Sequence, residues 1–389
     1  MWFFNSPEII FGEDALAYLE NLAGRRAMIV TDPTLVRFGY AAQVSAVLKT
    51  AGLSVQIFDK VEPEPSVETV KAGALAMQAF APDWIVGLGG GSALDAAKAM
   101  WVLYERPDIE PEAINPIDKI NLRQKARFIA IPTTSGTGSE ATWAIVLTHT
   151  AERRKMGLGS RENLPDMAIL DPALVMGMPP RLTADTGLDA LTHAIEGFTG
   201  QWHNDFSDGM CLKAAQLVMQ FLRRAYQDGS DAEARQRMQN AASIAGLGFG
   251  NSMAALAHGL GHSLGAVFHI PHGRAVSLAL PYTIEYCVRG DPESTRYTVL
   301  ARFLELPHGS EFEAASALAQ AIRRLEADLD SPSSLAKCGV TDEMLESEMA
   351  LLVDNASNDT QTVTSTRIPD TKEMERLLRA MQVGEPIDF

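Results

Sequence analysis

The fold is decided by the stretch Trp84-Ile-Val-Gly-Leu-Gly-Gly-Gly-Ser-Ala-Leu-Asp-Ala-Ala-Lys98. Its apolar start predicts a buried strand, and the residues after Ser92 predict a helix. Between them, Gly89, Gly90 and Gly91 let the backbone approach a diphosphate closely. Ser92 and the free N–H groups of the first helical turn can then bind its oxygens. The stretch is neither a full dinucleotide fingerprint, since Ser92 replaces the third glycine, nor a Walker A loop. A tight turn needed only for packing is the alternative.

Strand-like and helix-like segments alternate through the first half of the chain. The apolar runs that predict strands are Ala27–Thr31, Leu53–Phe58, Trp84–Leu88 and Phe128–Ile131, and helical patterns between them include Tyr40–Ala51 and Val67–Phe80. Such alternation predicts a mainly parallel sheet covered by helices, with ligands bound at the carboxyl ends of its strands.

Two further strand ends carry groups that suit a nucleotide. Pro132-Thr-Thr-Ser-Gly-Thr-Gly-Ser-Glu140 offers small and hydroxylic residues, as a phosphate or ribose cradle would. Asp32 ends the first run, where a carboxylate can accept hydrogen bonds from an adenosine ribose and repel a 2′-phosphate, which favours NAD over NADP. A flexible linker and an ordinary helix-capping Asp are the respective alternatives.

The pattern changes after Pro179-Pro180. Helical segments follow, among them Ser207–Gln227, Asp231–Gly246, Glu311–Leu329 and Thr371–Met381, while Asp328–Pro332 and Asp354–Asp370 are expected to be loops. We therefore expect an α/β, Rossmann-like dinucleotide-binding domain over residues 1–180 and an all-helical metal-binding domain over residues 181–389. The active site is expected in the cleft between them.

Asp189 and His193 stand four residues apart in Leu182-Thr-Ala-Asp-Thr-Gly-Leu-Asp-Ala-Leu-Thr-His-Ala-Ile-Glu-Gly197. This segment predicts a helix capped by Thr183 or Asp185 and stopped at Gly200. Residues four apart lie on one helix face, so the carboxylate and the imidazole can hold one ion together.

A second pair, His258 and His262, repeats this spacing, and His272 follows in Ile-Pro-His-Gly, where the proline sets a turn before a new helix. One such pair alone would indicate an ordinary surface contact. Ionisable residues rarely enter sequence so rich in Ala, Gly and Leu unless they are paired or ligated. Three imidazoles and one carboxylate suit Zn or Fe. The pattern is not His-Glu-x-x-His, so the general base of a metalloprotease is missing.

Composition narrows the class of protein. The chain has 389 residues, 46% of them hydrophobic, and a formal net charge of −16. This charge argues against nucleic acid or an anionic membrane as a partner, because both need a basic surface. Three scattered cysteines form neither a disulfide framework nor a Cys-x-x-Cys site. The first residues lack the pattern of a signal peptide, and the longest apolar run, 241–267, is interrupted by polar residues. We expect a cytoplasmic protein.

Four motifs together resemble the iron-dependent (group III) alcohol dehydrogenases. They are Gly89-Gly-Gly-Ser-x-x-Asp-x-x-Lys98, Pro132-Thr-Thr-Ser-Gly-Thr-Gly-Ser-Glu140, Gly187-Leu-Asp-Ala-Leu-Thr-His-Ala-Ile-Glu196, and His258-x-x-x-His262 with Pro271-His-Gly273. They occur in the family's order and span nearly the whole chain. The resemblance implies the fold expected above, which the family shares with dehydroquinate synthase, and commonly a homodimer.

The resemblance also implies roles for individual residues. The metal ligands would be Asp189, His193, His258 and His272, with His262 beside the metal but not bound to it. Residues implied to line the dinucleotide site are Gly89, Gly90, Gly91, Ser92, Asp95, Lys98, Thr133, Thr134, Thr137, Thr142 and Lys155, with Asp32 at the adenosine ribose. Phe249 would lie in the substrate pocket.

Two positions depart from the family's pattern. Many relatives have Asn between two prolines where this chain has Pro63-Glu64-Pro65, so a cofactor contact there is left open. Relatives that reduce lactaldehyde have a polar Asn where Ala144 follows Trp143. This substitution in the substrate pocket points to a bulkier or less polar substrate than a small diol.

The activity implied is reversible hydride transfer between a primary alcohol, or the matching aldehyde, and NAD(H). Fe(II), or Zn(II), would act as a Lewis acid on the alcohol oxygen. A catalytic metal must leave a position for the substrate, so a fifth protein ligand would close the site. His262 is therefore expected to relay the alcohol proton, with a purely structural histidine as the alternative.

Rival interpretations share the fold. One is a zinc glycerol dehydrogenase. Another is a dehydroquinate synthase, which would need more basic residues around an anionic substrate than Arg274 alone provides. A third is a non-catalytic assembly protein that keeps a structural metal.

Overall fold

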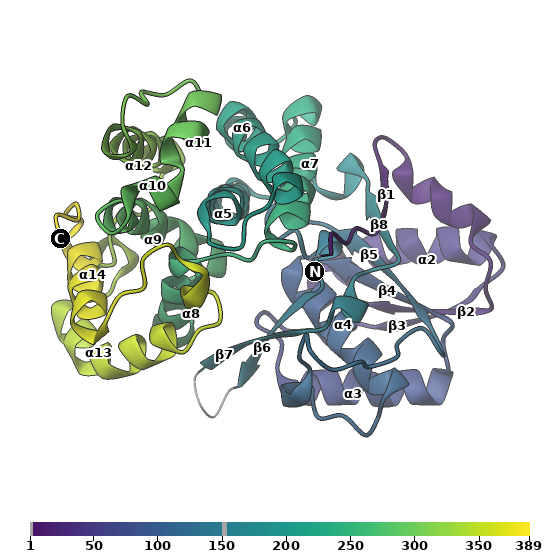
Figure 1. Cartoon of the computed structure of the whole chain (residues 1–389). Coiled ribbons are helices and arrows are strands. Elements are labelled where there is room, and N and C mark those ends of the chain that lie inside the picture. Colours follow the sequence, from purple (N-terminus) through teal and green to yellow (C-terminus); the bar gives the residue numbers. More distant parts are fainter. Residues whose placement is uncertain (1–2, 150–153) are drawn as a thin grey trace. The chain divides into compact units, whose positions relative to one another are not determined.

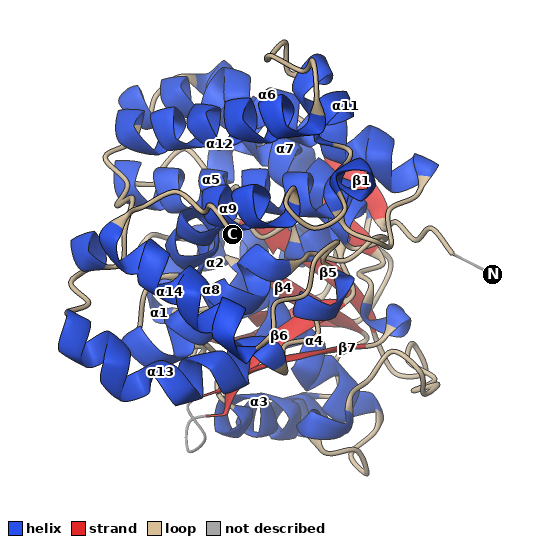
Figure 2. Cartoon of the chain, turned by 60° about the vertical axis from the view of Figure 1, so that its left-hand side comes forward, coloured by secondary structure: helices blue, strands red, loops and turns tan. Residues whose placement is uncertain are grey.

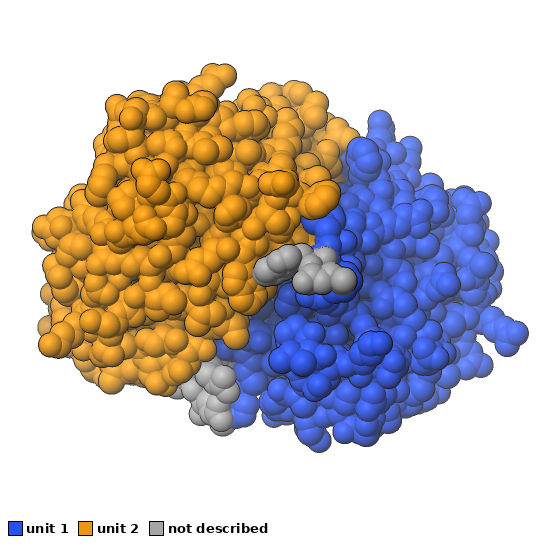
Figure 3. Space-filling model, viewed as in Figure 1, with its two compact units in different colours: residues 1–178 blue, residues 179–389 orange. Residues whose placement is uncertain are grey.

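A computed structural model describes residues 3–149 and 154–389. The chain divides into two compact units, one ending at Met178 and the other beginning at Pro179 (Figure 3). Within the described residues, unit 1 holds all of the strands and unit 2 is helical.

Unit 1 is built on a six-stranded parallel sheet with the strand order β1-β8-β5-β4-β2-β3 (Figure 1). A separate antiparallel hairpin consists of β6 and β7. The strands are β1 (Glu8–Phe11), β2 (Arg26–Val30), β3 (Ser54–Phe58), β4 (Trp84–Gly89), β5 (Arg127–Pro132), β6 (Ala144–His149), β7 (Arg154–Gly159) and β8 (Met167–Leu170).

The central strands are apolar on both faces because helices cover both. In β2, Met28 and Val30 face one apolar core, while Ala27 and Ile29 face another. This alternation follows from the two-residue period of a strand. The first core is closed by α3 (Val67–Phe80) and α4 (Gly91–Glu105), and the second by the 3₁₀ helix η1 (Ala15–Asn21) and α2 (Tyr40–Thr50). The short α1 (Pro33–Arg37) follows β2 directly.

The predicted parallel α/β sheet is confirmed, and each of the four expected strands lies within a residue or two of its expected bounds. Strands β1 and β8 and the β6–β7 hairpin were not predicted. Two of them, Glu8–Phe11 and Met167–Leu170, are only 4 residues long, which is too short for a periodic signal.

Unit 2 is a bundle of helices (Figure 2). The helices pack around one large apolar core. Helix α5 packs against α6, α7 and α9, and α8 packs against α9 and α13. The helices are α5 (Pro180–Thr199), α6 (Asp205–Gln227), α7 (Ala232–Phe249), α8 (Leu256–Phe268), α9 (His272–Cys287), α10 (Pro292–Thr295), α11 (Tyr297–Phe303), α12 (Glu311–Asp328), α13 (Asp342–Ser357) and α14 (Thr371–Val383).

Two sequence predictions in unit 2 were wrong in detail. Helix α5 begins at Pro180, with Pro179 at its N-cap, so neither Thr183 nor Asp185 caps it. A proline is favoured in the first turn of a helix. A backbone N–H group there would have no partner within the helix, so its absence in proline costs no hydrogen bond. The expected loop 354–370 begins later, because α13 continues to Ser357 and buries Val353 and Ala356 in the core. None of the described helices is long and apolar enough to cross a membrane.

Candidate functional site

Three acidic or basic side chains line one buried face of α5. Asp189, His193 and Glu196 follow one another at intervals of four and three residues, which places them on the same side of a helix. All three are buried. The structure therefore continues the predicted Asp189–His193 pair by one further acidic residue.

Helices α8 and α9 bring the remaining histidines to this face. His258 lies in the first turn of α8, and His272 is the first residue of α9, directly after Pro271. The chain reverses between the two helices at His269, which caps α8 in the left-handed conformation with φ 55°. Gly273 allows α9 to approach α5, since a Cβ there would lie 2.2 Å from the carbonyl oxygen of Asp185.

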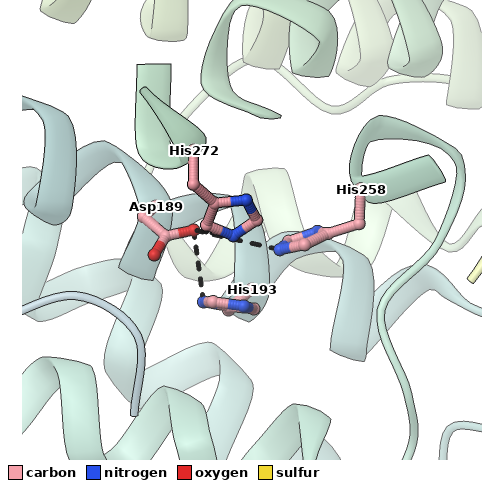
Figure 4. A group of neighbouring side chains, drawn as sticks. All are labelled: Asp189, His193, His258 and His272. Carbon is pink, nitrogen blue, oxygen red and sulfur yellow. Dashed lines mark ion pairs between the residues drawn. The ribbon is translucent and has the colours of Figure 1, made fainter. Parts of the chain in front are cut away.

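The three imidazoles surround a single carboxylate oxygen. Oδ1 of Asp189 lies 3.6 Å from Nδ1 of His193, 3.9 Å from Nε2 of His258 and 3.5 Å from Nε2 of His272 (Figure 4). One ligand atom from each of the four residues lies within 4.8 Å of all the others. His262 is not part of this group.

The chemistry of the four groups fits a divalent transition metal. Three imidazole nitrogens and a carboxylate oxygen are the donor types that Zn and Fe accept. Nε2 of His258 is buried and has no hydrogen-bond partner among the described residues. A buried nitrogen of this kind is costly unless something binds it, and a cation at the centre of the group would do so.

Glu196 fixes the orientation of His258. Its Oε2 lies 2.6 Å from Nδ1 of His258, and its two oxygens also accept the backbone N–H groups of Ala255 and Ala257. Burial alone would lower the pKa of His258, but the hydrogen bond and charge of Glu196 outweigh it, and the pKa lies above its ordinary value. The sequence had signalled Glu196 by its spacing, seven residues after Asp189, yet no role was predicted for it.

His262 has a carboxylate partner of its own. Its Nδ1 lies 2.8 Å from Oδ2 of Asp359, and its ring stacks on that of His272 with centroids 5.3 Å apart. Burial tends to raise the pKa of Asp359, but the charge and hydrogen bond of His262 hold it below the ordinary value. Asp359 was missed by the sequence analysis, since 97 residues separate it from His262.

The predicted pocket residue Phe249 ends α7 and stacks on His193, with ring centroids 3.9 Å apart and planes inclined by 10°. The second predicted pocket residue, Ala144, begins β6 in unit 1, and its carbonyl oxygen accepts a hydrogen bond from Nζ of Lys98.

In unit 1 the glycine loop opens α4 as predicted. Gly89 ends β4 with φ 150°, Gly90 is the N-cap, and Gly91 and Ser92 form the first turn. A Cβ at Gly91 would lie 2.7 Å from Cγ2 of Thr137, so the small residue lets the threonine-rich loop pack against the helix start.

Hydrogen bonds and packing contacts hold that threonine-rich loop in place. The backbone N–H of Thr133 donates to the carbonyl of Gly89, Oγ1 of Thr137 accepts from the N–H of Ser139, and Oγ1 of Thr142 lies 3.5 Å from the carbonyl of Ser139. The side chain of Thr134 lies against Gly90. These contacts place Thr134 and Thr137 at the N-terminus of α4 and Thr133 at the end of β4, whereas Thr142 contacts Ser139.

Asp95 and Lys98 bind the protein itself. Asp95 accepts hydrogen bonds from Oγ of Ser139 and the N–H of Val146, while Lys98 donates to both oxygens of Ser139. Burial lowers the pKa of Lys98 to about 8, against the opposing charges of Asp95 and Glu140. Both side chains therefore position the loop and strand β6.

Asp32 follows β2 and is the N-cap of α1. Its Oδ1 accepts the N–H groups of Thr34 (2.7 Å) and Leu35 (3.1 Å). Asp32 therefore caps α1 through Oδ1, and Oδ2 remains available to accept a hydrogen bond from another donor. The last predicted cofactor residue, Lys155 in β7, forms an ion pair with Glu64.

Both halves of the sequence match family descriptions. Residues 6–172 match "Iron-containing alcohol dehydrogenase", and residues 183–382 match the C-terminal domain of the Fe-containing alcohol dehydrogenase family. The chain belongs to the iron-containing alcohol dehydrogenases. The resemblance inferred from the four motifs is confirmed. The chain is accordingly an oxidoreductase of alcohols and aldehydes that uses a divalent metal and NAD(P).

Relatives of this family match along the whole chain. An NADPH-dependent butanol dehydrogenase of Clostridium saccharobutylicum is 38% identical over 384 residues, which is 98% of each protein. Aldehyde-alcohol dehydrogenase 2 of Entamoeba histolytica is 36% identical; the match covers 97% of this chain but 46% of that longer protein. The structure of an alcohol dehydrogenase from Oenococcus oeni superposes with a TM-score of 0.91 at 29% identity, over 98% of this chain and 100% of that one.

Proposed function

We propose that this protein interconverts an uncharged primary alcohol and its aldehyde, with Fe(II) as the metal and NAD(H) as the preferred cofactor. The observation that carries the proposal is the convergence of His193, His258 and His272 on Oδ1 of Asp189. These four residues would hold a divalent ion, which would supply Lewis acidity toward the alcohol oxygen, and a bound nicotinamide cofactor would supply the hydride acceptor.

The chain's own residues contribute orientation and exclusion of water. Phe249 covers one face of the His193 ring, which shields that ligand and leaves less room for solvent. The Gly89–Ser92 loop and the N-terminus of α4 bind the diphosphate of the cofactor, because free N–H groups and the helix dipole both favour an anion there.

His262 receives the alcohol proton in this proposal. With Nδ1 bonded to Asp359, its Nε2 is the atom left to accept a proton, and the carboxylate stabilises the imidazolium that results. The same arrangement, reversed, delivers a proton to the aldehyde oxygen. Asp359 acts through His262 and is a positioning residue.

The ion pair of Arg274 favours an uncharged substrate. Arg274 is the basic residue closest in sequence to His272. Its guanidinium is paired with both carboxylate oxygens of Asp185, at 3.2 Å and 2.9 Å. A neutralised guanidinium offers little to an anionic substrate, which argues against a dehydroquinate synthase. The apolar Phe249, stacked on His193, favours a substrate with a hydrocarbon chain over a small diol.

The deciding experiment is an alcohol panel. Protein reconstituted with Fe(II), or in parallel with Zn(II), is offered ethanol, 1-propanol, 1-butanol, 1-hexanol, 1,2-propanediol and glycerol, with NAD or NADP. We expect reduction of the cofactor with the longer primary alcohols, highest with Fe(II) and NAD. Preference for glycerol with Zn(II) would support the glycerol dehydrogenase alternative, and no turnover with either metal would support a non-catalytic assembly protein.

NADP(H) is the alternative cofactor, because the butanol dehydrogenase relative is named as NADPH-dependent. Asp32 supports NAD, since a carboxylate at the end of β2 repels a 2′-phosphate.

We further propose a cytoplasmic homodimer. Its mass is tested by light scattering: a stable mass of one 42.1 kDa chain would exclude the dimer.

A further inference from the structure

The residue between Pro63 and Pro65, Glu64, forms an ion pair with the β6–β7 hairpin. Nζ of Lys155, in β7, lies 2.8 Å from Oε1 of Glu64. The Lys155 side chain is 5% exposed, whereas the Glu64 side chain is 38% exposed. A buried ammonium needs a counter-charge, and here a residue at the protein surface provides it.

The backbone at Glu64 shows that this is an unusual place for a glutamate. Its φ is 58°, in the left-handed region that Asn adopts more readily than Glu. The charge of Glu64 therefore comes with a small conformational cost, which the ion pair with Lys155 offsets.

Glu64 also adjoins the proposed diphosphate site. Its N–H lies 3.4 Å from Oγ of Ser92, in the first turn of α4. The hairpin that carries Lys155 is fixed to the same segment, because the N–H of Thr148 donates to the carbonyl of Pro65 and Thr148 pairs with Ser66. Thus Lys155, Glu64 and the start of α4 form one connected group.

Glu62, two residues earlier, does not share this arrangement. Its carboxylate accepts hydrogen bonds from Ser66 and from Oγ1 of Thr69 at the start of α3. Glu64 is consequently the carboxylate that neutralises Lys155.

We propose that Glu64 sets the affinity of this enzyme for its dinucleotide, by acting as an internal counter-ion that competes with the cofactor's diphosphate for Lys155. With Glu64 in place, the cofactor meets a neutral pair and is held less tightly, which eases its exchange after each turnover. Without Glu64, the buried Lys155 takes the diphosphate as its counter-ion. The inference rests on the proposed function, because it requires that NAD(P) binds at the start of α4.

The test measures dissociation constants of NADH and NADPH from their fluorescence on the full-length protein. Glu64→Gln should tighten both about fivefold at low salt, the size expected for one partly screened charge, and the gain should shrink as NaCl is added. Equal gains for the two cofactors are expected because they share the diphosphate. A gain confined to NADPH would overturn the proposal, since it would place Lys155 at the 2′-phosphate.

Two matched variants isolate Lys155. The double variant Glu64→Gln/Lys155→Met has no charge in the pair and should lose the gain, binding no more tightly than the parent protein; if it stays as tight as Glu64→Gln, Lys155 is not involved. Glu68→Gln removes an exposed charge of the same sign from the first turn of α3 and should change nothing.

Thermal unfolding gives a second measure. Glu64→Gln should lower the Tm of the cofactor-free protein and enlarge the rise in Tm caused by ADP-ribose, because the ligand replaces the missing counter-ion. If the parent protein binds neither NADH nor NADPH, the proposed function fails. If the parent binds them and Glu64→Gln binds no more tightly, only the role of Glu64 fails.

Discussion

Glu196 and His258 are joined by a hydrogen bond of 2.6 Å between Oε2 and Nδ1, and this bond turns Nε2 of the imidazole toward Asp189. A carboxylate in this position selects the tautomer of a ligating histidine and increases its basicity. The two residues lie on different helices, α5 and α8, so the contact also fixes the relative position of the helices that carry the proposed metal ligands.

Replacing Glu196 by Gln should weaken metal binding about 10- to 100-fold. One amide oxygen cannot satisfy the imidazole and the two backbone N–H groups that both carboxylate oxygens now accept. Competition with a chromophoric chelator measures the affinity. Glu285→Gln, which alters a carboxylate paired with Arg323, serves as the control and should bind metal normally. Parental affinity in Glu196→Gln would mean that His258 is held by its helix alone.

His272→Ala should leave the purified protein with far less metal than the parent. His272 is the most exposed of the four proposed ligands, so its loss opens the site without creating a large cavity. Metal content is measured by mass spectrometry. Chelation should lower the Tm of the parent but not of the variant, since an ion stabilises only the state that binds it. Stoichiometric metal in the variant would remove His272 from the ligand set.

Asp32→Gly should shift the preference from NAD toward NADP by about 1–3 kcal/mol, the size of a hydrogen bond to a charged group. The structure adds a complication, because Asp32 also caps α1. Asp32→Asn keeps a capping oxygen while removing the charge, and should relax cofactor choice with little loss of stability. The ratio of kcat/KM values for the two cofactors is the measurement. An unchanged ratio in both variants places Asp32 outside the adenosine pocket.

His262→Gln should retain metal and NAD binding but lower turnover and change its pH profile. Asp359→Asn should produce the same kind of change to a smaller extent, because an amide can hold the ring in place but cannot stabilise its charge. Metal content, NADH affinity and kcat across pH 5–9 are compared for both variants. Metal loss like that of His272→Ala would make His262 a ligand, and a parental pH profile would make it a packing residue.

Asp189 and His193 could be singled out as a candidate pair because their signal is local: they are one helical turn apart on α5. The i,i+4 spacing of His258 and His262 on α8 did not by itself show which of the two would be a ligand, and the full set of four came from the family resemblance. Periodicity likewise predicted the central strands, whose apolar runs are buried on both faces. Such features need only a few neighbouring residues to be read.

Residue pairs that meet only in the tertiary structure could not be predicted from the sequence. Asp359 approaches His262 because α13 packs on α8. Glu64 meets Lys155 because Thr148 of β6 pairs with Ser66, and Lys155 lies opposite Thr148 in β7. The helix start at Pro180 was missed for another reason: a polar N-cap was expected, whereas α5 begins with a proline, which leaves one fewer N–H group without a partner in the first turn.

The pairing of β1 with β8 imposes an order on biosynthesis. Residue Glu8 emerges from the ribosome well before its partner Met167, which follows only after most of the rest of unit 1 has been made. At ordinary translation rates of about 5–20 residues per second, roughly 10–30 s separate the synthesis of β1 from that of its partner strand β8. During that time an apolar segment, Ile9 and Ile10 among it, is open to chaperones or to other nascent chains. Expression yield should therefore depend on how quickly codons 12–166 are translated.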